Sequence, residues 1–485
     1  MPAREELGSS SFRDRWQSLL RAGSPQLLSL LGTFAPWLIE SSVEHFVETL
    51  KTSSFRSGRM DYPPPIDRHS IVEISHSFHR QAGTETTPVR DNLEAYGRGV
   101  TSVRVAHQAN WLPSVNVVAQ PKILDTLTRL TNTNSAQLFV ILDYDAQSDR
   151  RYRHAHFPSP SHIKGYASLS VPHRFSNGDG VMFTEYEPPV QSISDFGVRL
   201  RAIVHQDSAL ARRHGIRFSK YRLDRNITTL ESELQFAREN ADLLSDMNAI
   251  YLSRVVNLCF GLPIAFVKGR EALPLLAAHM EYLWIRAHEL SAIRHKAAQL
   301  MEELGLSVSP SMVGEVDLVP FWIRCDCGRR VPLYWTANRS LIAVGSCSKC
   351  ELYYRVGTKE FRRLADGGVV IPRILIDDLL DGFAWNHQIG SSYQGGIQHY
   401  VFSTIVATMF GLRALPEFLS CRSSTDLTDV ISDLYSHFLG ELIALGSNRA
   451  IASAELLRTG RASIAHTSIW GQLGSGLIDS GFLSD

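Results

Sequence analysis

The chain has 485 residues, with 49 basic and 49 acidic side chains, so its formal net charge is zero. Hydrophobic residues make up 44% and charged residues 20%, the balance of a folded protein with a large buried core and room for about three domains. Neutral charge argues against a protein that holds nucleic acid mainly through its overall field. No apolar stretch approaches the roughly 20 residues of a membrane span, and the N-terminus does not resemble a secretory signal. We therefore expect a cytoplasmic, multidomain globular protein with no membrane partner.

The N-terminal region, residues 1–98, is predicted to be helical. Residues 27–38 contain six apolar side chains with the spacing of one helix face. The segment Tyr62-Pro63-Pro64-Pro65 interrupts the helical pattern and is typical of a surface linker.

From residue 101 the pattern changes to strand, helix and strand. Residues 103–108 (VRVAHQ) and 137–143 (QLFVILD) are predicted strands, and Ser114 is placed to cap a helix that runs to about Leu130. This order predicts a parallel β-α-β unit, and we assign residues 99–225 to the first half of a Rossmann-like core. The sequence has no G-x-G-x-x-G and no P-loop motif, which disfavours standard dinucleotide and P-loop phosphate sites.

Residues 226–312 are predicted to form a helical insertion. Its last part carries an apolar stripe with residues three or four apart, which indicates a packed core or a subunit seam and keeps a homodimer open. The stripe consists of Leu276, Met280, Leu283, Ala287, Leu290, Ile293, Ala297, Leu300 and Leu304.

A group of four cysteines follows, in two close pairs separated by 19 residues: Cys325, Cys327, Cys347 and Cys350. Two thiolates from each of two turns suit a tetrahedral zinc, which four thiolates would close into a structural site. Residues 329–344 between the pairs are predicted to form two short strands around a turn at 337–340, so we expect a zinc ribbon over 313–364. Four reduced cysteines or two disulfides are the alternatives, and the C-x-C spacing of the first pair is less common than C-x-x-C.

The second half of the Rossmann-like core is predicted over residues 365–420. Residues 369–376 (VVIPRILI) form an expected returning strand, followed by a glycine-rich loop at 389–397 and an apolar helix from about 398 to 409. Residues 421–485 are expected to form a helical C-terminal region with a flexible tail. The predicted fold class is thus α/β, with a parallel sheet, a helical insertion and a zinc ribbon.

The first candidate site follows the first strand, where His107, Gln108 and Asn110 stand at the entry to a helix. Ligands of parallel sheets bind beyond the carboxyl ends of strands, and a helix start there offers N–H groups to an anion. These side chains could stabilise a phosphate or a developing oxyanion. The alternative is that His107 only caps the turn.

The second candidate site follows the second strand, where Asp143, Asp145 and Asp149 stand close together in sequence. Carboxylates there could orient an amine, hold a ribose hydroxyl or bind Mg²⁺. The alternative is that they cap the next turn.

The third candidate site is the glycine-rich loop and the start of the helix after it. Paired glycines let a backbone approach a ligand closely, and polar side chains flank them. The candidates are Tyr393, Gln394, Gly395, Gly396, Gln398 and His399. A plain glycine-rich turn is the alternative.

Several of these segments resemble the bacillithiol-biosynthesis cysteine-adding enzyme family, which has a class I aminoacyl-tRNA-synthetase-like Rossmann core. The likeness spans, with gaps, residues 100 to 415. His107-Gln108 stands where that family has T-G-Q-Q, and 139–149 (FVILDYDAQSD) where it has V-F-W-x-A-x-E-D-H-D, of which only Asp149 is retained. The segment 372–403 is similar to the family's R-P-x-x-Q-D and A-Y-V-G-G-P-G-E motifs through Arg373, Asp377 or Asp378, Gly395, Gly396 and Tyr400.

The first half of the core also resembles the WbqC-like proteins, which have an H-Q-P-N-x-L-P opening and are associated with glycan biosynthesis. Asn110, Leu112, Pro113 and Asp143 match that pattern. Both resemblances imply a class I synthetase-like site.

The resemblance to the cysteine-adding family implies an amide-forming ligase that adds an amino acid, cysteine in that family, to a small-molecule acceptor. His107, Gln108 and Asn110 would then stabilise phosphate or oxyanion charge, and Asp143 or Asp145 would hold the incoming amine. The substrates would contact Asp149, Arg373, Asp377 and the 393–399 loop. ATP enters as a candidate cosubstrate by analogy of fold alone.

Two other functions stay open. One is a class I aminoacyl-tRNA synthetase paralogue, with the ribbon and the Arg150–Arg153 cluster on tRNA, which neutral charge and the lack of a K-M-S-K-S-like loop disfavour. The other is a non-catalytic partner protein that retains the fold.

Overall fold

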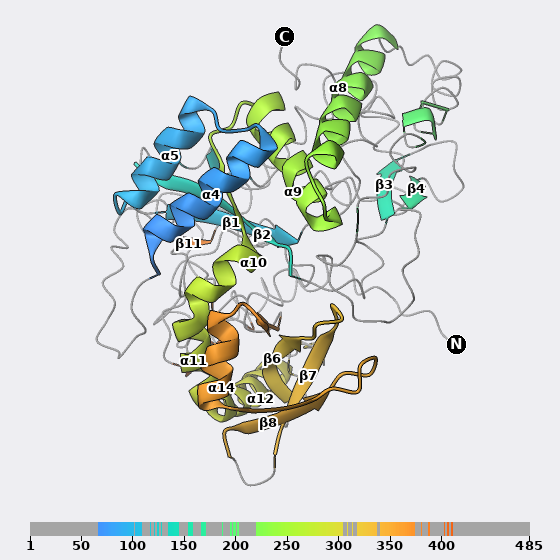
Figure 1. Ribbon diagram of the computed structural model, residues 1–485. Coiled ribbons are helices and arrows are strands. Elements are labelled where there is room, and N and C mark those ends of the chain that lie inside the picture. Colours follow the sequence, from blue (N-terminus) through green and yellow to red (C-terminus); the bar gives the residue numbers. More distant parts are fainter. Residues whose placement is uncertain are drawn as a thin grey trace.

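The computed structural model describes residues 66–100, 102–108, 134–144, 228–303, 318–336 and 340–373, together with backbone segments and single positions elsewhere between 117 and 410. Predictions for residues 1–65 and 411–485 lie outside the described residues. Figure 1 shows two larger sheets, with helices α10 (Gly269–Ala272) and α11 (Ala277–Ile285) running from one toward the other. No helix in the described part of the chain combines the length and the apolar character that a membrane crossing requires.

Two helices open the described part of the chain. Helix α4 (Arg68–Ala82) begins at Asp67, whose carboxylate accepts a hydrogen bond from the His69 N–H at 3.0 Å, and ends at Gly83 with φ of 65°. Helix α5 (Thr87–Gly97) follows after a short turn. The part of the predicted N-terminal region that is described is therefore helical.

The first sheet has four strands in the order β11-β1-β2-β5, and all neighbours are parallel. Its strands are β1 (Ser102–Gln108), β2 (Ala136–Leu142), β5 (Ala265–Lys268) and the short β11 (His387–Gln388). Every residue of β2 and β5 is buried, as expected when both faces of a parallel sheet are covered. The two predicted strands and their parallel pairing are confirmed, and the single positions described between them, such as Leu124 and Thr128, are helical. Along the chain β2 is followed by a separate antiparallel pair, β3 (His154–Pro158) and β4 (Tyr166–Ser170).

Strand β5 is an edge strand, and helix α4 satisfies its backbone. The Phe266 N–H donates to His79 Nε2 at 2.9 Å, and the Phe266 C=O accepts from Ser75 Oγ at 2.8 Å. His79 Nδ1 is in turn 2.7 Å from Thr84 Oγ1. These buried side chains cover an edge that would otherwise present unpaired backbone groups.

The segment 226–304 is mainly helical, as predicted. It contains the end of α8 (Lys220–Glu239), then α9 (Leu244–Arg254), η4 (Val255–Cys259), α10, η5 (Leu273–Leu276), α11 and α12 (Ala287–Glu303). Strand β5 is an addition that the sequence pattern does not separate from the helices, because a strand of four residues is too short to display a strand period. The predicted apolar stripe lies in the core, with buried Leu276, Met280, Leu283, Ala287, Leu290 and Ala297.

The second sheet, which we call the ribbon sheet, is antiparallel with the order β10-β6-β7-β8-β9. Its elements are β6 (Leu318–Arg324), β7 (Arg330–Trp335), β8 (Ile342–Ser346), β9 (Tyr353–Gly357), helix α14 (Thr358–Asp366) and β10 (Val370–Pro372). Strands β7 and β8 are the two strands predicted around the turn at 337–340, and their antiparallel pairing confirms the hairpin.

One prediction for this region is wrong. The described part of the segment, residues 369–373, does not join the parallel sheet: β10 pairs antiparallel with β6, with Val370 opposite Ile323 and Pro372 opposite Phe321. A buried apolar run suits either sheet, and the turn after α14, with Gly368 at φ of 67°, sends it back to β6. After residue 365, it is β11 that lies in the parallel sheet.

The inner face of the ribbon sheet packs against helices through aromatic rings. The Trp284 ring of α11 lies 4.1 Å from the Phe361 ring and 4.8 Å from the Trp335 ring, measured between centroids, and Phe321 lies 4.9 Å from Phe361. These residues belong to the same buried cluster as Leu138 and Val140 of the parallel sheet. The two sheets therefore share one continuous core.

Candidate functional site at the parallel strand ends and the cysteine turns

The strand register brings the carboxyl ends of β1, β2 and β5 to one edge of the parallel sheet. Gln108 is opposite Leu142, and Ile141 is opposite Lys268, so Asp143 follows directly beside both neighbouring strand ends. The sequence-predicted pair His107 and Asp143 thus belongs to the same edge, where ligands of parallel sheets bind.

Asp143 is almost fully buried, at 1% exposure. Its Oδ1 accepts a hydrogen bond from the Arg270 backbone N–H at 2.8 Å, and its Oδ2 lies 3.5 Å from Arg270 Nε. Burial raises the pKa of Asp143 to about 6, and the Arg270 guanidinium partly opposes this rise. Asp143 therefore caps the start of α10 and also titrates close to neutral pH.

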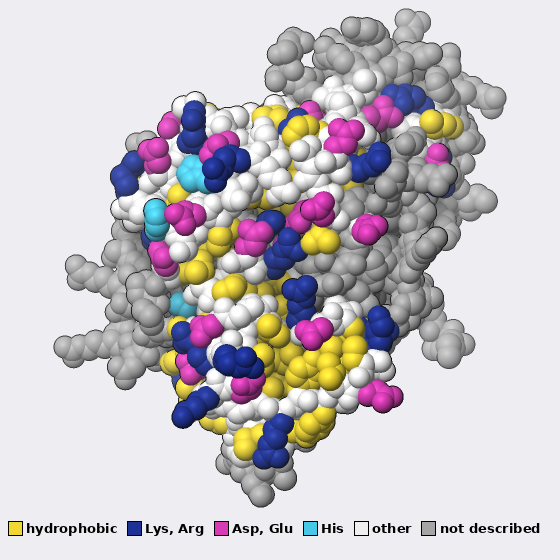
Figure 2. All heavy atoms as spheres, in the orientation of Figure 1, with side chains coloured by type: hydrophobic (Ala, Val, Ile, Leu, Met, Phe, Trp, Pro, Cys, Tyr) yellow, Lys and Arg dark blue, Asp and Glu magenta, His cyan; other side chains and the backbone are white. Residues whose placement is uncertain are grey.

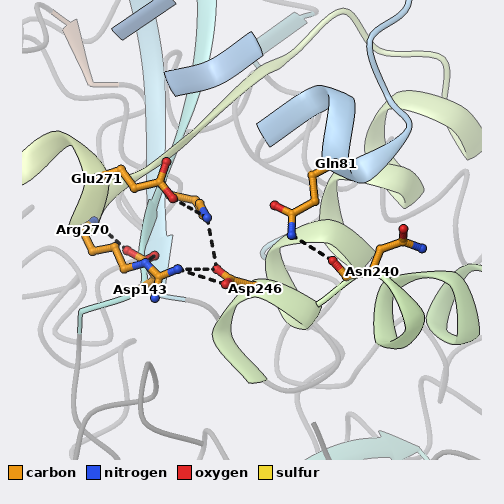
Figure 3. Close-up of polar contacts among 7 residues, drawn as sticks. Gln81, Asp143, Asn240, Asp246, Arg270 and Glu271 are labelled. Atoms are coloured by element: carbon orange, nitrogen blue, oxygen red, sulfur yellow. Dashed lines mark hydrogen bonds and ion pairs between the residues drawn. The ribbon is translucent and has the colours of Figure 1, made fainter. Parts of the chain in front are cut away.

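A chain of buried and partly buried charges extends from Asp143 to helix α9 (Figure 3). Arg270 donates to both carboxylate oxygens of Asp246, at 3.1 and 2.9 Å, and Lys268 Nζ lies 3.3 Å from Asp246 Oδ1. Lys268 also pairs with Glu271. We call Asp143, Asp246, Lys268, Arg270 and Glu271 the strand-end network.

Sequence reasoning missed four members of this network. Lys268 and Arg270 flank Gly269 immediately after a four-residue apolar run, a strand-end signal comparable to that of Asp143. Because the pattern on both sides of β5 is helical, the sequence does not reveal that a strand ends there. Asp246 joins the network only because α9 packs beside the end of β5.

Gly269 explains how α10 reaches Asp143. A Cβ atom at this position would lie 2.7 Å from the Ile141 carbonyl oxygen and 2.8 Å from a ring carbon of Tyr144. The backbone can approach the end of β2 this closely only without a side chain. That approach places the Arg270 N–H within reach of the Asp143 carboxylate.

His107 is buried at 5% exposure, and its Nδ1–H donates to the Gln108 carbonyl oxygen at 3.0 Å. Burial lowers the pKa of His107 to about 4, so the ring is neutral at physiological pH. In that tautomer Nε2 can accept a hydrogen bond but cannot donate one to an oxyanion, which argues against the predicted oxyanion role of this ring.

The remaining candidates divide into two groups. The structure places Arg373 directly after β10, with its guanidinium carbon 5.1 Å from the centroid of the Trp322 ring in the ribbon sheet. This location follows from the pairing of β10 with β6. The other candidates lie outside the described residues: Asn110, Asp145, Asp149, Asp377, Tyr393, Gln394, Gly395, Gly396, Gln398 and His399.

The four predicted cysteine ligands come together at one end of the ribbon sheet. The Sγ atoms of Cys325, Cys327, Cys347 and Cys350 all lie within 4.8 Å of one another, and those of Cys327 and Cys347 are 3.5 Å apart. Four thiolates at about 2.3 Å from a tetrahedral zinc are about 3.8 Å apart, so the cluster has the dimensions of a metal site. No disulfide joins these cysteines.

Two tight turns hold the cysteines. In the first, the Cys325 N–H donates to the Arg329 C=O and the Gly328 N–H donates to the Cys325 C=O, both at 2.8 Å. In the second, the Cys347 N–H donates to the Leu352 C=O and the Glu351 N–H to the Cys347 C=O, both at 2.9 Å. The turns thus point thiols from two parts of the chain at one place.

The charge state of Cys347 also suits a ligand. Burial raises the pKa of this thiol, but backbone N–H groups of Cys350 and Lys349 and the neighbouring thiols lower it to about 6. Within the described residues, the cysteine cluster is the only group of three or more His, Cys, Asp or Glu side chains arranged to hold a metal.

No protein-family model matches the chain, and no curated protein matches it. The function therefore has to be argued from the two sites themselves.

Proposed function

We propose that this protein is an amide-forming ligase that adds an amino acid to a small-molecule acceptor at the carboxyl edge of its parallel sheet. The observation that carries the proposal is Asp143, a buried carboxylate with a pKa of about 6 at a strand end. Strand ends of parallel sheets are where ligands of such folds bind, and a strongly shifted pKa there marks a candidate functional group.

Amide formation needs a carboxylate of this kind. The ammonium form of the substrate must lose one proton before its nitrogen can attack. When that nitrogen bonds to the activated carboxyl carbon, it loses a second proton and the activating group leaves with the bonding electron pair. A carboxylate that titrates near neutral pH can hold the ammonium group and accept the first proton, and the leaving group or water can take the second. Asp143 fills this role in our proposal. ATP, by analogy of fold, would activate the carboxyl group.

The charges of the strand-end network also support the ligase proposal. Arg270 and Lys268 lie between three carboxylates, so the group is close to neutral and can accept a zwitterionic amino acid without a large change in net charge. An amino acid presents both an ammonium and a carboxylate group, and the network contains a partner of each sign.

We also propose that the cysteine cluster binds one zinc ion. Cys325, Cys327, Cys347 and Cys350 would supply all four ligands, which leaves no open coordination position. A bound zinc would hold the two turns of the ribbon together and would take no part in the ligation.

A ligand screen tests the ligase proposal. Purified protein is heated with each amino acid, with and without ATP, and the melting temperature is recorded. A ligand present at about 100 times its Kd stabilises the folded state by about 2.7 kcal/mol, which raises the melting temperature by several degrees. If no amino acid and no nucleotide raises the melting temperature, the non-catalytic alternative is favoured.

The variant Asp143→Asn separates the proposed proton transfer by Asp143 from its structural hydrogen bond. The amide oxygen can still accept the Arg270 N–H hydrogen bond, but the side chain can no longer take up a proton. We expect Asp143→Asn to fold and to lose product formation when the amino acid, ATP and candidate acceptors are assayed by mass spectrometry. Full activity in this variant would refute the role of Asp143.

A further inference from the structure

The outer face of the ribbon sheet, opposite the helices, combines aromatic and arginine side chains. Figure 2 shows hydrophobic side chains gathered over β6 and β7. Tyr334 is 40% and Tyr353 is 66% exposed, and Trp322 is half-buried. Strand alternation places Trp322, Tyr334 and Tyr353 on the side opposite the buried Phe321, Leu333 and Val356. We call this surface the ribbon face.

The strand register mixes arginines among these rings. Arg324 is opposite Arg330, and Tyr334 is opposite Val344, which is itself opposite the exposed Arg355. Directly opposed residues on one face of an antiparallel sheet lie about 5 Å apart, so these side chains form one continuous surface.

Arginines also stack on the tryptophan of this face. The guanidinium carbon of Arg330 lies 3.8 Å from the centroid of the Trp322 ring, and that of Arg373 lies 5.1 Å from it. Such stacking holds the guanidinium groups beside the aromatic ring at the surface of the sheet.

The segment that builds this face is basic, although the whole chain is neutral. Residues 318–373 contain ten lysines and arginines and four aspartates and glutamates. A zinc ion with four thiolates adds a net charge of about −2, and the segment stays basic. A polyanion is therefore the partner whose charge this surface complements.

We propose that the ribbon face binds single-stranded nucleic acid. Exposed aromatic rings on an antiparallel sheet provide flat partners for unpaired bases, and guanidinium groups between them pair with phosphates. A protein partner would use the aromatic rings equally well, but the arginines beside these rings, Arg324, Arg330, Arg355 and Arg373, favour a phosphate backbone. This proposal is independent of the ligase proposal, since it concerns a different sheet.

The test is a titration of the full-length, zinc-loaded protein into a fluorescein-labelled oligouridylate of about 12 nucleotides, followed by fluorescence anisotropy. We expect saturable binding that weakens when salt is raised from about 50 to about 200 mM. Tyr334→Ala should raise the Kd about tenfold through loss of one stacked base. Arg355→Glu should weaken binding and reduce its salt dependence.

Two control variants match these changes away from the ribbon face. Ile285→Ala truncates another exposed apolar side chain, on α11, and Arg98→Glu reverses an exposed charge after α5. Both should bind the oligonucleotide as the unmodified protein does, and zinc content and circular dichroism confirm that each variant is folded. The proposal is overturned if the protein does not bind the probe, or if the control variants weaken binding as much as the ribbon-face variants do. It is also overturned if Tyr334→Ala leaves the Kd for the oligonucleotide unchanged and only abolishes self-association of the protein.

Discussion

At the scale of single residues, Asp143 has two roles that can be separated. Its carboxylate closes the first turn of α10 through the Arg270 N–H, and its burial raises the pKa into the range useful for proton transfer. A carboxylate used only as a helix cap has no need of burial, because caps at protein surfaces function in water.

We predict that Asp143→Ala destabilises the fold more than Asp143→Asn does. Both variants remove one of two carboxylates that face the guanidinium, but only alanine also leaves the Arg270 N–H without an acceptor, so its total cost should reach about 2 to 4 kcal/mol. Urea unfolding measures the difference. Equal losses in both variants would mean that the backbone hydrogen bond contributes little.

Gly269 provides a second prediction at this scale. Gly269→Ala places a methyl group 2.7 Å from the Ile141 carbonyl oxygen, a backbone atom that can move only if β2 moves. We expect a loss of about 1 to 3 kcal/mol in the free energy of unfolding. Gly357→Ala is the matched control, because a Cβ atom there would have no atom within 4 Å, and it should change stability far less.

At the scale of elements, the ribbon sheet depends on both its aromatic core and its cysteine turns. The rings of Trp284, Trp335 and Phe361 attach the inner face to α11 and α14. The two turns at the other end of the sheet are only partly held by packing: Cys325 and Cys347 belong to the buried core, whereas Cys350 and Leu352 are exposed. A metal ion would provide the missing cross-link.

We therefore predict one equivalent of zinc in the purified protein. Its removal by a chelator should lower the melting temperature, because close thiolates repel each other and the turns lose their cross-link. Elemental analysis and calorimetry provide the two measurements. Cys347→Ser should lower the zinc content, whereas Cys259→Ser, in η4 beside α9, should leave it unchanged.

At the scale of the whole molecule, buried histidines should make stability depend on pH. Burial lowers the pKa of His79 to about 3 and those of His107 and His279 to about 4. In the unfolded chain these rings take up protons near pH 6.5, so the unfolded state binds more protons than the folded state below that pH. Stability is fully present above about pH 6.5 and falls as the pH falls toward 4, by up to about 1.4 kcal/mol per unit for each histidine.

Asp143 has the opposite effect on how the free energy of unfolding depends on pH. Its folded-state pKa of about 6 lies above the unfolded value, so its contribution is present at low pH and is lost as the pH rises through about 6. One aspartate offsets only part of the effect of three histidines. Urea midpoints between pH 7 and pH 4.5 should therefore fall, and His79→Gln should flatten the slope, whereas His69→Gln, at an exposed position, should not.

Prediction from sequence succeeded where the evidence was local. The strands at 103–108 and 137–143 have apolar runs bounded by turns, and the cysteine spacing predicted a cluster whose sulfur atoms are indeed close together. The apolar stripe of the helical segment likewise predicted a core face. The strands, the cysteine cluster and the apolar stripe can each be predicted from side chains that are close together in the chain or that follow a regular spacing.

What the sequence determined by itself, then, is a parallel β-α-β unit, a mainly helical segment and a four-cysteine ribbon. Only the tertiary structure decided which strands pair, because the apolar run at 369–376 suits both sheets equally and the turn after α14 selects β6. It also decided the strand-end network, since Asp143, Asp246 and Arg270 are more than 20 residues apart and meet only where Gly269 lets two backbones touch. Local sequence patterns indicate which residues are buried and where the chain turns, whereas contacts between charges distant in the sequence depend on how the elements pack.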